Sequence, residues 1–381
     1  MANTNFAQLT TEQKTFWSMD FWKMARNNSF VMQFAGTGPN SMIQQITELT
    51  ASEKGTRAVL TLVADLEGDG IMGDSTLEGN EEAIRAFDTV ITIDQMRQAN
   101  RLAGRMADQK SIVNFRETSR DVLAYSFADR IDQLAFLTLA GVKYTKRCNG
   151  ATRPVLGVGQ NFSDLEYAST VTAPTANRHY YAKSDGSISV ATQSANAARL
   201  GHTSNSDMGN IGYKTIVNLK AAAKDLYLRG IRGGANEEVF HMFVTPLIMA
   251  QLKLDADFIA NVRNAGVRGD GNLLFRGSDS LMVDGVMIHE FRHVYNTTGA
   301  VSGGKMGATG TDDATRVLFC GSQALGFADL GEADYVEDTF DYGNQAGISI
   351  GKIFGLRKPK YNSDYNGAVE DFGIIVLDTA V

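Results

Sequence analysis

The stretch TRAVLTLVADLEGDGIMGDSTLEGNEEAIRAFDTVITI, residues 56–93, decides how this chain is organised. Apolar and β-branched side chains dominate its two ends, residues 56–63 and 86–93, which predicts two strands. The glycine-punctuated segment between them, residues 65–80, is typical of a long hairpin tip. An isolated two-stranded ribbon is only marginally stable in water, so we expect this hairpin to lie on another surface.

This hairpin is also the main source of negative charge. Residues 56–100 hold nine acidic and three basic side chains, in a chain whose formal net charge is -7. Such a segment is expected to seek a basic or polar partner surface, and a solvated acidic loop is the alternative. The candidate interface residues here are Arg57, Asp65, Glu67, Asp69, Asp74, Glu78, Glu81 and Glu82.

A long amphipathic helix is predicted after the hairpin, over residues 111–142. Its apolar side chains recur at a spacing close to the helical period, which predicts one buried stripe. They are Ile112, Phe115, Val122, Tyr125, Ile131, Leu134 and Leu139. Gly141 is a suitable residue to end the helix.

The N-terminal segment, residues 1–55, reads as a mixed arm. Both tryptophans of the chain, Trp17 and Trp22, lie in its one helical stretch, residues 12–26. Aromatic side chains dominate contact energetics. The helix is therefore either a satellite packed on its own core or an anchor on a neighbouring copy, and both remain open.

Composition excludes several classes of protein. A net charge of -7 and a pI near 5.4 argue against binding nucleic acid by neutralising phosphates. Cys148 and Cys320 have no metal-like spacing and form no disulfide framework, so a reducing cytosol is the expected folding environment. No signal peptide and no apolar run of membrane-spanning length is apparent.

The remaining chain predicts a mixed α+β fold. Residues 149–210 read as irregular strands and surface loops. Helices are expected at 211–229 and 246–254, and strands at 241–244, 281–288, 316–319, 347–354 and 372–377. No βαβ repetition indicates a doubly wound sheet.

One motif suggests catalysis. Residues 289–293 (HEFRH) satisfy H-E-x-x-H, which binds zinc when a helix places both histidines one turn apart. Here the flanking residues favour a strand, in which residues four apart lie about 13 Å from each other, too far to share one ion. We therefore expect no metal, no cofactor and no catalytic residue.

In their order, these elements resemble the tailed-bacteriophage major capsid proteins of the Hong Kong 97-type fold. The likeness covers essentially the full chain and involves no catalytic signature. It is carried by TRAVLTL (56–62), FDTVITIDQ (87–95), the long helix, RVLFCGSQAL (316–325), FDYGNQAGISIG (340–351) and DFGIIVLDTA (371–380).

The resemblance implies a division of the chain into five parts. They are an N-terminal arm (1–55), an extended E-loop hairpin (56–100), a peripheral domain (101–214) that contains the spine helix 111–142, an axial domain (215–330), and a return to the peripheral sheet with a C-terminal strand (331–381). No large cleaved N-terminal segment is expected, and no pair of residues can be assigned to a covalent cross-link.

The resemblance also implies a structural, non-enzymatic role. Copies of the chain would assemble into hexamers and pentamers of an icosahedral head that encloses double-stranded DNA without sequence-specific contact. Portal, scaffold and decoration proteins would be its other partners, with no membrane involved. The chain would be a virion component assembled in the host bacterial cytoplasm.

Two alternatives remain at this point. One is a zinc-dependent hydrolase that uses the H-E-x-x-H match at 289–293. The other is an encapsulin-like nanocompartment shell, which shares the capsid fold.

Overall fold

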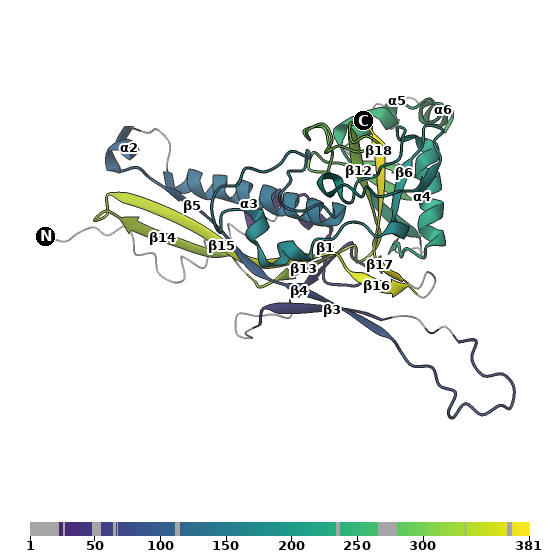
Figure 1. Cartoon of the computed structure of the whole chain (residues 1–381). Helices are drawn as coiled ribbons and strands as arrows, with labels where there is room; N and C mark the ends of the chain where they lie inside the picture. Colours follow the sequence, from purple (N-terminus) through teal and green to yellow (C-terminus); the bar gives the residue numbers. More distant parts are fainter. Residues whose placement is uncertain are drawn as a thin grey trace.

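A long helix, α3 (Phe115–Ala140), runs along a six-stranded sheet and ends beside an eight-stranded sheet (Figure 1). The computed structural model describes residues 23–25, 27–47, 55–63, 66, 68–110, 115–233, 237–265, 280–331, 333–363 and 368–381. The predicted helix at 12–26 falls almost entirely outside these ranges, and only its end, residues 23–25, is seen to be helical.

The six-stranded sheet is organised around one long strand, β15. Its members are β1 (Ala35–Gly36), β2 (Ile43–Ile46), β5 (Asp94–Arg101), β13 (Leu325–Asp329), β14 (Asp334–Phe340) and β15 (Gln345–Arg357). β5 and β14 pair antiparallel with the two edges of β15 and form the extended ribbon that ends near α2 (Arg105–Lys110) in Figure 1. The predicted E-loop, 56–100, is therefore too long, because β5 belongs to this sheet and not to the hairpin.

α3 occupies the predicted helical segment, of which residues 111–114 are not described. Ile131 and Leu134 are buried as expected, but Val122 and Tyr125 are 52% and 60% exposed. The prediction of a single stripe is wrong because residues 131–140 are buried on nearly every side, between the two sheets. Where a helix is covered on nearly every side, its apolar residues are not confined to one stripe.

Gly141 ends α3 as predicted. It has a positive φ of 67°, and Val142 N donates to the carbonyl of Leu137 at 2.9 Å, five residues back. This pattern closes a helix through a left-handed residue. A Cβ at Gly141 would also lie 2.5 Å from the Thr172 carbonyl oxygen, so only glycine fits here.

The eight-stranded sheet lies at the other end of the molecule. Its members are β6 (His179–Ala182), β7 (Ile188–Val190), β8 (Ile231–Arg232), β9 (Glu238–Val244), β10 (Ser280–Val283), β11 (Val286–Glu290), β12 (Ala314–Cys320) and β18 (Ile374–Ala380). α4 (Tyr213–Asp225), α5 (Pro246–Leu254) and α6 (Ala256–Ala265) lie together beside it (Figure 1). α5 has the predicted bounds, with Pro246 at its first turn, where a missing N–H costs nothing.

The sheets do not follow the predicted domain boundaries. β18 pairs with β12 and β6 in the eight-stranded sheet and does not return to the sheet of β15. β13, inside the range expected for the axial domain, joins β15 instead. The strand predicted at 281–288 is a hairpin, because Asp284 and Gly285 adopt positive φ and make a tight turn between β10 and β11.

The remaining elements are short. Two further ribbons pair β3 (Arg57–Val63) with β4 (Ala86–Thr92) and β16 (Lys360–Ser363) with β17 (Ala368–Asp371). The 3-10 helices are η1 (Val31–Phe34), η2 (Phe162–Asp164), η3 (Glu166–Thr170), η4 (Ala176–Arg178) and η5 (Ala197–Arg199). Residues 149–210 contain η2, η3, η4, η5 and the short strands β6 and β7, which agrees with the irregular structure expected there. Among the described helices, none has the length and apolar content to cross a bilayer.

Candidate assembly interface

The base of the hairpin lies on the sheet of its own subunit. Leu60 of β3 and Ile91 of β4 pack with Ala328 of β13 in a small buried cluster. Two glycines permit the approach: a Cβ at Gly326 would lie 2.6 Å from Ile91 Cδ1, and one at Gly355 would lie 2.3 Å from the Thr92 carbonyl oxygen. The hairpin was predicted to lie on another surface. Its base does so within its own subunit, on the sheet that contains β13.

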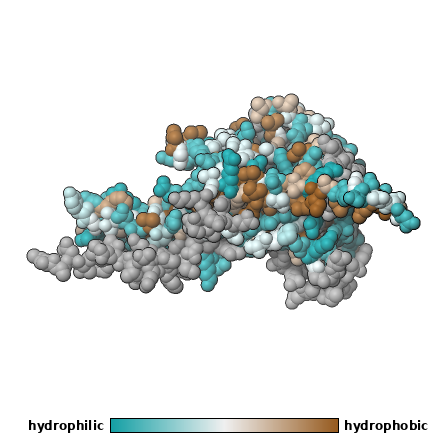
Figure 2. All heavy atoms as spheres, turned by 90° about the horizontal axis from the view of Figure 1, so that it is seen from below, coloured by the Kyte–Doolittle hydropathy of each residue, from teal (hydrophilic) through white to brown (hydrophobic). Residues whose placement is uncertain are grey.

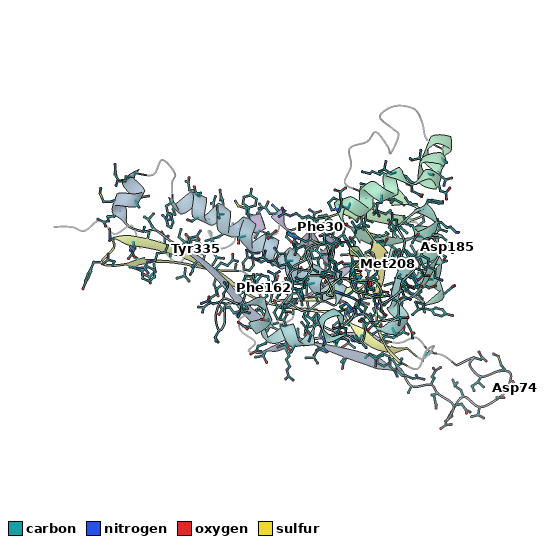
Figure 3. All side chains as sticks on the ribbon, turned by 45° about the horizontal axis from the view of Figure 1, so that its top comes forward. Phe30, Asp74, Phe162, Asp185, Met208 and Tyr335 are labelled. Carbon is teal, nitrogen blue, oxygen red and sulfur yellow. The ribbon has the colours of Figure 1, made fainter. Side chains whose placement is uncertain are left out.

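The tip of the hairpin, described at residue 66 and over residues 68–85, projects away from the rest of the subunit. Figures 1 and 3 show it standing clear of both sheets, with Asp74 at its outer end. Its backbone is held by its own acids: Glu82 accepts a hydrogen bond from Gly68 N at 2.7 Å, and Glu81 accepts one from Gly79 N at 2.9 Å.

The structure places five of the ten predicted interface residues on this tip. Its exposed acids are Asp69, Asp74, Glu78, Glu81 and Glu82. Arg57 is exposed too, but it lies at the start of β3, opposite Thr92, and is not part of the tip. Trp17, Trp22, Asp65 and Glu67 lie outside the described residues.

Sequence reasoning missed the apolar side chains of the same tip. Leu66, Met72, Leu77 and Ile84 are 61%, 71%, 63% and 73% exposed. In Figure 2, which views the hairpin side of the molecule, the projection at the right carries both hydrophilic and hydrophobic residues. Exposed apolar side chains grouped on a projecting element are typical of a protein–protein contact. In the sequence, the position of these apolar residues among the acids of the tip could have indicated that they are exposed.

The end of the N-terminal arm is fixed to α3. Asp132 accepts hydrogen bonds from Ser29 Oγ at 2.6 Å, Phe30 N at 3.0 Å and Val31 N at 3.1 Å. Phe30 then stacks on Phe291 with ring centres 4.3 Å apart. β2 follows and pairs in parallel with β13, so residues 29–46 are built into the subunit.

The two histidines of the H-E-x-x-H match have separate partners. His289 lies at the end of β11 and shares a 2.9 Å hydrogen bond with His241 of β9. His293 lies in the turn that follows, and its Nε2 is 2.6 Å from an oxygen of Asp129 on α3. Among the described residues, no three His, Cys, Asp or Glu side chains gather as a metal site. The geometry therefore gives the zinc-hydrolase alternative no support.

Buried ion pairs, also missed from sequence, join the strands of the core. Arg316 of β12 pairs with Asp378 of β18, and His179 Nε2 lies 2.7 Å from the same carboxylate. Burial alone would raise the pKa of Asp378, but the charges of Arg316 and His179 and their hydrogen bonds hold it well below its usual value. In the sequence, Arg316 begins the apolar run 316–320 and Asp378 ends the apolar run 374–378. These opposite charges could have indicated an ion pair between the two strands.

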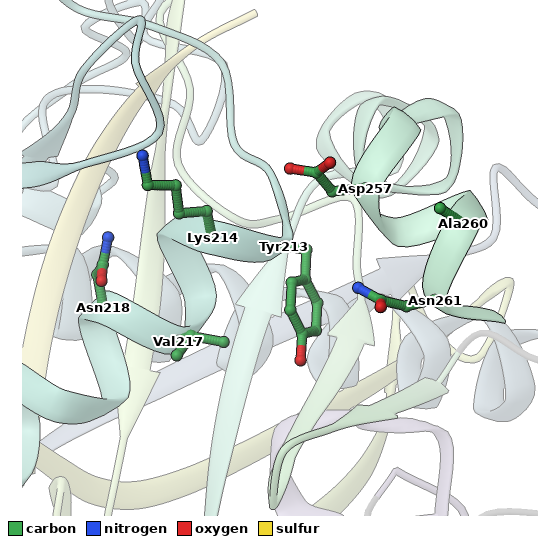
Figure 4. A pocket seen from close by; sticks show the side chains of 7 residues that line it. All are labelled: Tyr213, Lys214, Val217, Asn218, Asp257, Ala260 and Asn261. Atoms are coloured by element: carbon green, nitrogen blue, oxygen red, sulfur yellow. The ribbon is translucent and has the colours of Figure 1, made fainter. Parts of the chain in front are cut away.

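One shallow groove opens between α4 and α6 (Figure 4). It measures about 370 Å³ and is lined by Tyr213, Lys214, Val217, Asn218, Asp257, Ala260 and Asn261. It brings together one carboxylate, one ammonium group and one phenol, with no nucleophile next to a base. The groove has the character of a surface depression between packed helices.

Comparison with known proteins identifies the fold and the role. A family model described as phage capsid protein matches residues 5–381. The chain is 56% identical to the major capsid protein of Pseudomonas phage KPP25 over 373 residues, covering 98% of this chain and 96% of that protein.

Solved capsid structures resemble the whole chain. The capsid of Ralstonia phage GP4 matches with a TM-score of 0.71 at 25% identity, covering 92% of this chain and 90% of that one. The capsid asymmetric unit of Cyanophage Pam1 matches in fold with a TM-score of 0.67 at 15% identity, covering 100% and 96%. Neither the hydrolase nor the nanocompartment alternative gains support from these matches. With a long helix, two sheets and a projecting hairpin in the arrangement of these capsids, the chain belongs to the phage capsid protein family and is a major capsid protein of a phage head, with a Hong Kong 97-type α+β fold.

Proposed function

We propose that the hairpin tip is the element by which one copy of this capsid protein holds its neighbour in the shell. The supporting observation is that the tip carries five described acids and exposed apolar side chains, yet projects beyond its own subunit (Figure 3). Apolar side chains left in water cost free energy that a contact recovers. The acids would orient that contact toward a basic surface. Ser29 and Phe30, at the end of the N-terminal arm, are bound to Asp132 of α3. This attachment supports the proposal that the residues before them reach other copies.

The copies would form hexamers and pentamers of an icosahedral head around double-stranded DNA. A net charge of -7 supports an inner wall that does not grip the genome. Portal, scaffold and decoration proteins would complete the head, assembled in the host bacterial cytoplasm. The chain would act through these contacts alone, with no enzymatic activity.

The elements then take the roles of the capsid fold. β3, β4 and the tip would be the E-loop, α3 the spine helix, and the sheet around β15 the peripheral domain. The eight-stranded sheet with α4, α5 and α6 would be the axial domain near the capsomer centre. The sheet memberships support domain boundaries that fall between these elements, with β5 and β13 in the peripheral domain and β18 in the axial domain.

Deletion of residues 65–80 tests the role of the tip. The variant retains β3, β4 and the buried cluster at the base, so we expect a folded subunit by circular dichroism and no closed shells by electron microscopy. Replacing the same residues by an equally long glycine–serine segment separates length from side-chain contacts, and this variant should fail as well. Closed shells of normal size from the deletion variant would refute the proposal.

A further inference from the structure

A loop that follows α3 has a surface complementary to the hairpin tip. The segment 133–163 contains no acidic residue, while Lys143, Lys146, Arg147 and Arg153 lie within it. Lys143 and Arg147 are exposed. The loop is thus a continuous basic stretch on a chain whose net charge is negative.

The same loop exposes apolar side chains to an unusual extent. Val155 is 87% exposed, Leu156 70% and Val158 fully exposed. Single exposed apolar residues need no explanation, but three within four positions, in a loop that also carries four bases, form a distinct apolar group. We call residues 143–160 the basic loop.

Side-chain hydrogen bonds hold the basic loop in shape. Arg153 donates from Nε to the carbonyl of Lys146 at 2.9 Å and from Nη2 to Gln133 Oε1 of α3 at 2.8 Å. Its guanidinium also lies 4.6 Å from the ring centre of Phe162. These contacts tie the loop to the end of the helix.

Asn161 closes the outer part of the loop. Its Oδ1 accepts from Leu156 N at 3.0 Å, and its Nδ2 donates to the carbonyl of Gly157 at 2.7 Å. Asp164 accepts from the backbone N–H of Asn161 at 3.1 Å and fixes it in turn. A loop already ordered before binding loses little conformational entropy when a partner arrives.

The basic loop and the tip match in both charge and apolarity. Residues 65–82 contain seven acids and no base, and the exposed apolar residues of the tip lie among them and just after them. The exposed half of α3 matches less well, because its charges alternate in sign at Arg116, Glu117, Arg120 and Asp121. Charge complementarity across a contact selects the partner and its orientation.

The tip and the basic loop of one subunit are far apart. Figure 3 labels Asp74 at the outer end of the hairpin and Phe162, which borders the basic loop, near the middle of the molecule. A contact between the two surfaces must therefore join different copies.

We propose that the hairpin tip of one copy docks on the basic loop of a neighbouring copy, with Leu77 and its apolar neighbours packed against Val155, Leu156 and Val158 inside a ring of opposite charges. This inference rests on the proposed role of the tip and adds the surface that receives it.

Cross-linking tests the contact directly. We combine Leu77→Cys with Val158→Cys and treat assembled particles with a short bifunctional maleimide. Cys148 and Cys320 are free but buried, and burial raises the pKa of Cys148 to about 12, so neither native thiol should react. Covalent dimers and larger chains in a denaturing gel are expected. The matched control pairs Leu77→Cys with Leu254→Cys, at the 77% exposed end of α5, and should give only monomer.

Charge reversal provides the second test. Asp74→Lys with Glu78→Lys, or Lys143→Glu with Arg147→Glu, should each lower the assembled fraction by about tenfold, because like charges then face each other. All four substitutions together should restore assembly. As a control, Lys224→Glu with Arg229→Glu reverses two exposed bases outside the basic loop. Adding Asp74→Lys and Glu78→Lys to this control should not restore any assembly that it loses.

The outcomes separate this inference from the proposed function. Docking on the basic loop would be overturned if the test pair and the control pair of cysteines cross-linked equally. It would also be overturned if the variant with all four charge reversals assembled no better than the two double variants. If deletion of residues 65–80 still abolished shells in that case, the role of the tip would stand and only its receiving surface would be wrong.

Discussion

Arg316 and Asp378 face each other across β12 and β18 as a doubly hydrogen-bonded, fully buried ion pair. The two residues are in register, with Nε to Oδ1 at 2.8 Å and Nη2 to Oδ2 at 3.1 Å. The same guanidinium donates to the carbonyl of Ala140, at the end of α3, at 2.9 Å. One side chain therefore joins the end of α3 to the centre of the eight-stranded sheet, in addition to the apolar core that packs the helix against both sheets.

Replacing Arg316 by methionine should weaken this junction severely. The change leaves the Asp378 carboxylate buried beside His179 without its main partner, which costs about 3–5 kcal/mol. We expect a lower urea midpoint and a lower yield of soluble protein. Lys305→Met removes a partly exposed ion pair with Asp313 and serves as the control, with a change of about 1 kcal/mol or less. Similar midpoints for both variants would contradict a structural role for the buried pair.

Asp132→Asn should release the end of the N-terminal arm. An amide presents an NH₂ group where the carboxylate accepts hydrogen bonds from Ser29, Phe30 and Val31, so at least one donor stays unpaired at a cost of about 1–3 kcal/mol. Limited proteolysis should then cut before residue 35 at a higher rate than in the unchanged protein. The control is Asp121→Asn on the exposed side of α3, whose cutting rate should not change.

Acidification should destabilise the subunit through the pair His241 and His289. Burial lowers the pKa of His241 to about 4, the neighbouring His289 ring adds to the shift, and burial lowers the pKa of His289. The folded state thus favours neutral rings. Their contribution to stability is complete above the unfolded value of about 6.5 and is lost as the pH falls from there toward 4.

Replacement of the pair separates its effect from that of other groups. The double variant His241→Gln with His289→Gln should show a shallower loss of thermal stability between pH 6.5 and 4. His202, whose pKa burial also lowers to about 4, remains as a source of residual pH dependence. An unchanged slope in the double variant would show that the pair is not the sensitive group.

Gly355→Ala should lift the hairpin base from its sheet. The new Cβ would lie 2.3 Å from the Thr92 carbonyl oxygen and 3.0 Å from Ile91 Cγ2, and backbone cannot yield as a side chain can. Such overpacking costs about 1–3 kcal/mol, so we expect fewer closed particles from soluble subunits. Gly351→Ala on the same strand has the side chains of Arg97 and Gln95, and no backbone atom, as its nearest neighbours, and it is the matched control. Equal particle yields from both variants would argue against the close seating of the hairpin.

Local patterns predicted the hairpin and several helices well. The apolar and β-branched side chains of residues 56–63 predicted β3, and Pro246 predicted the start of α5. These features depend on a few adjacent residues, each of which favours the same structure. The acidic character of the tip was likewise evident, because the charge of a side chain follows from the residue type alone.

Longer-range arrangement was not predictable in the same way. β12 and β18 are apolar runs covered on both faces, and such runs do not specify which strand lies beside them. The sequence therefore predicted β18 as a strand but not its neighbours β12 and β6. The stripe on α3 failed at Val122 and Tyr125 because burial of that helix changes along its length. The shape of the basic loop depends on hydrogen bonds from Arg153 and Asn161, which no periodicity reveals.

Electron microscopy of particles assembled from the full chain tests the central claim most directly. The density for residues 66–84 should lie on a neighbouring subunit in closed shells, with its outer end against residues 143–160 of that neighbour. A hairpin folded back on its own subunit, or a purified chain that stays monomeric at high concentration, would contradict the account.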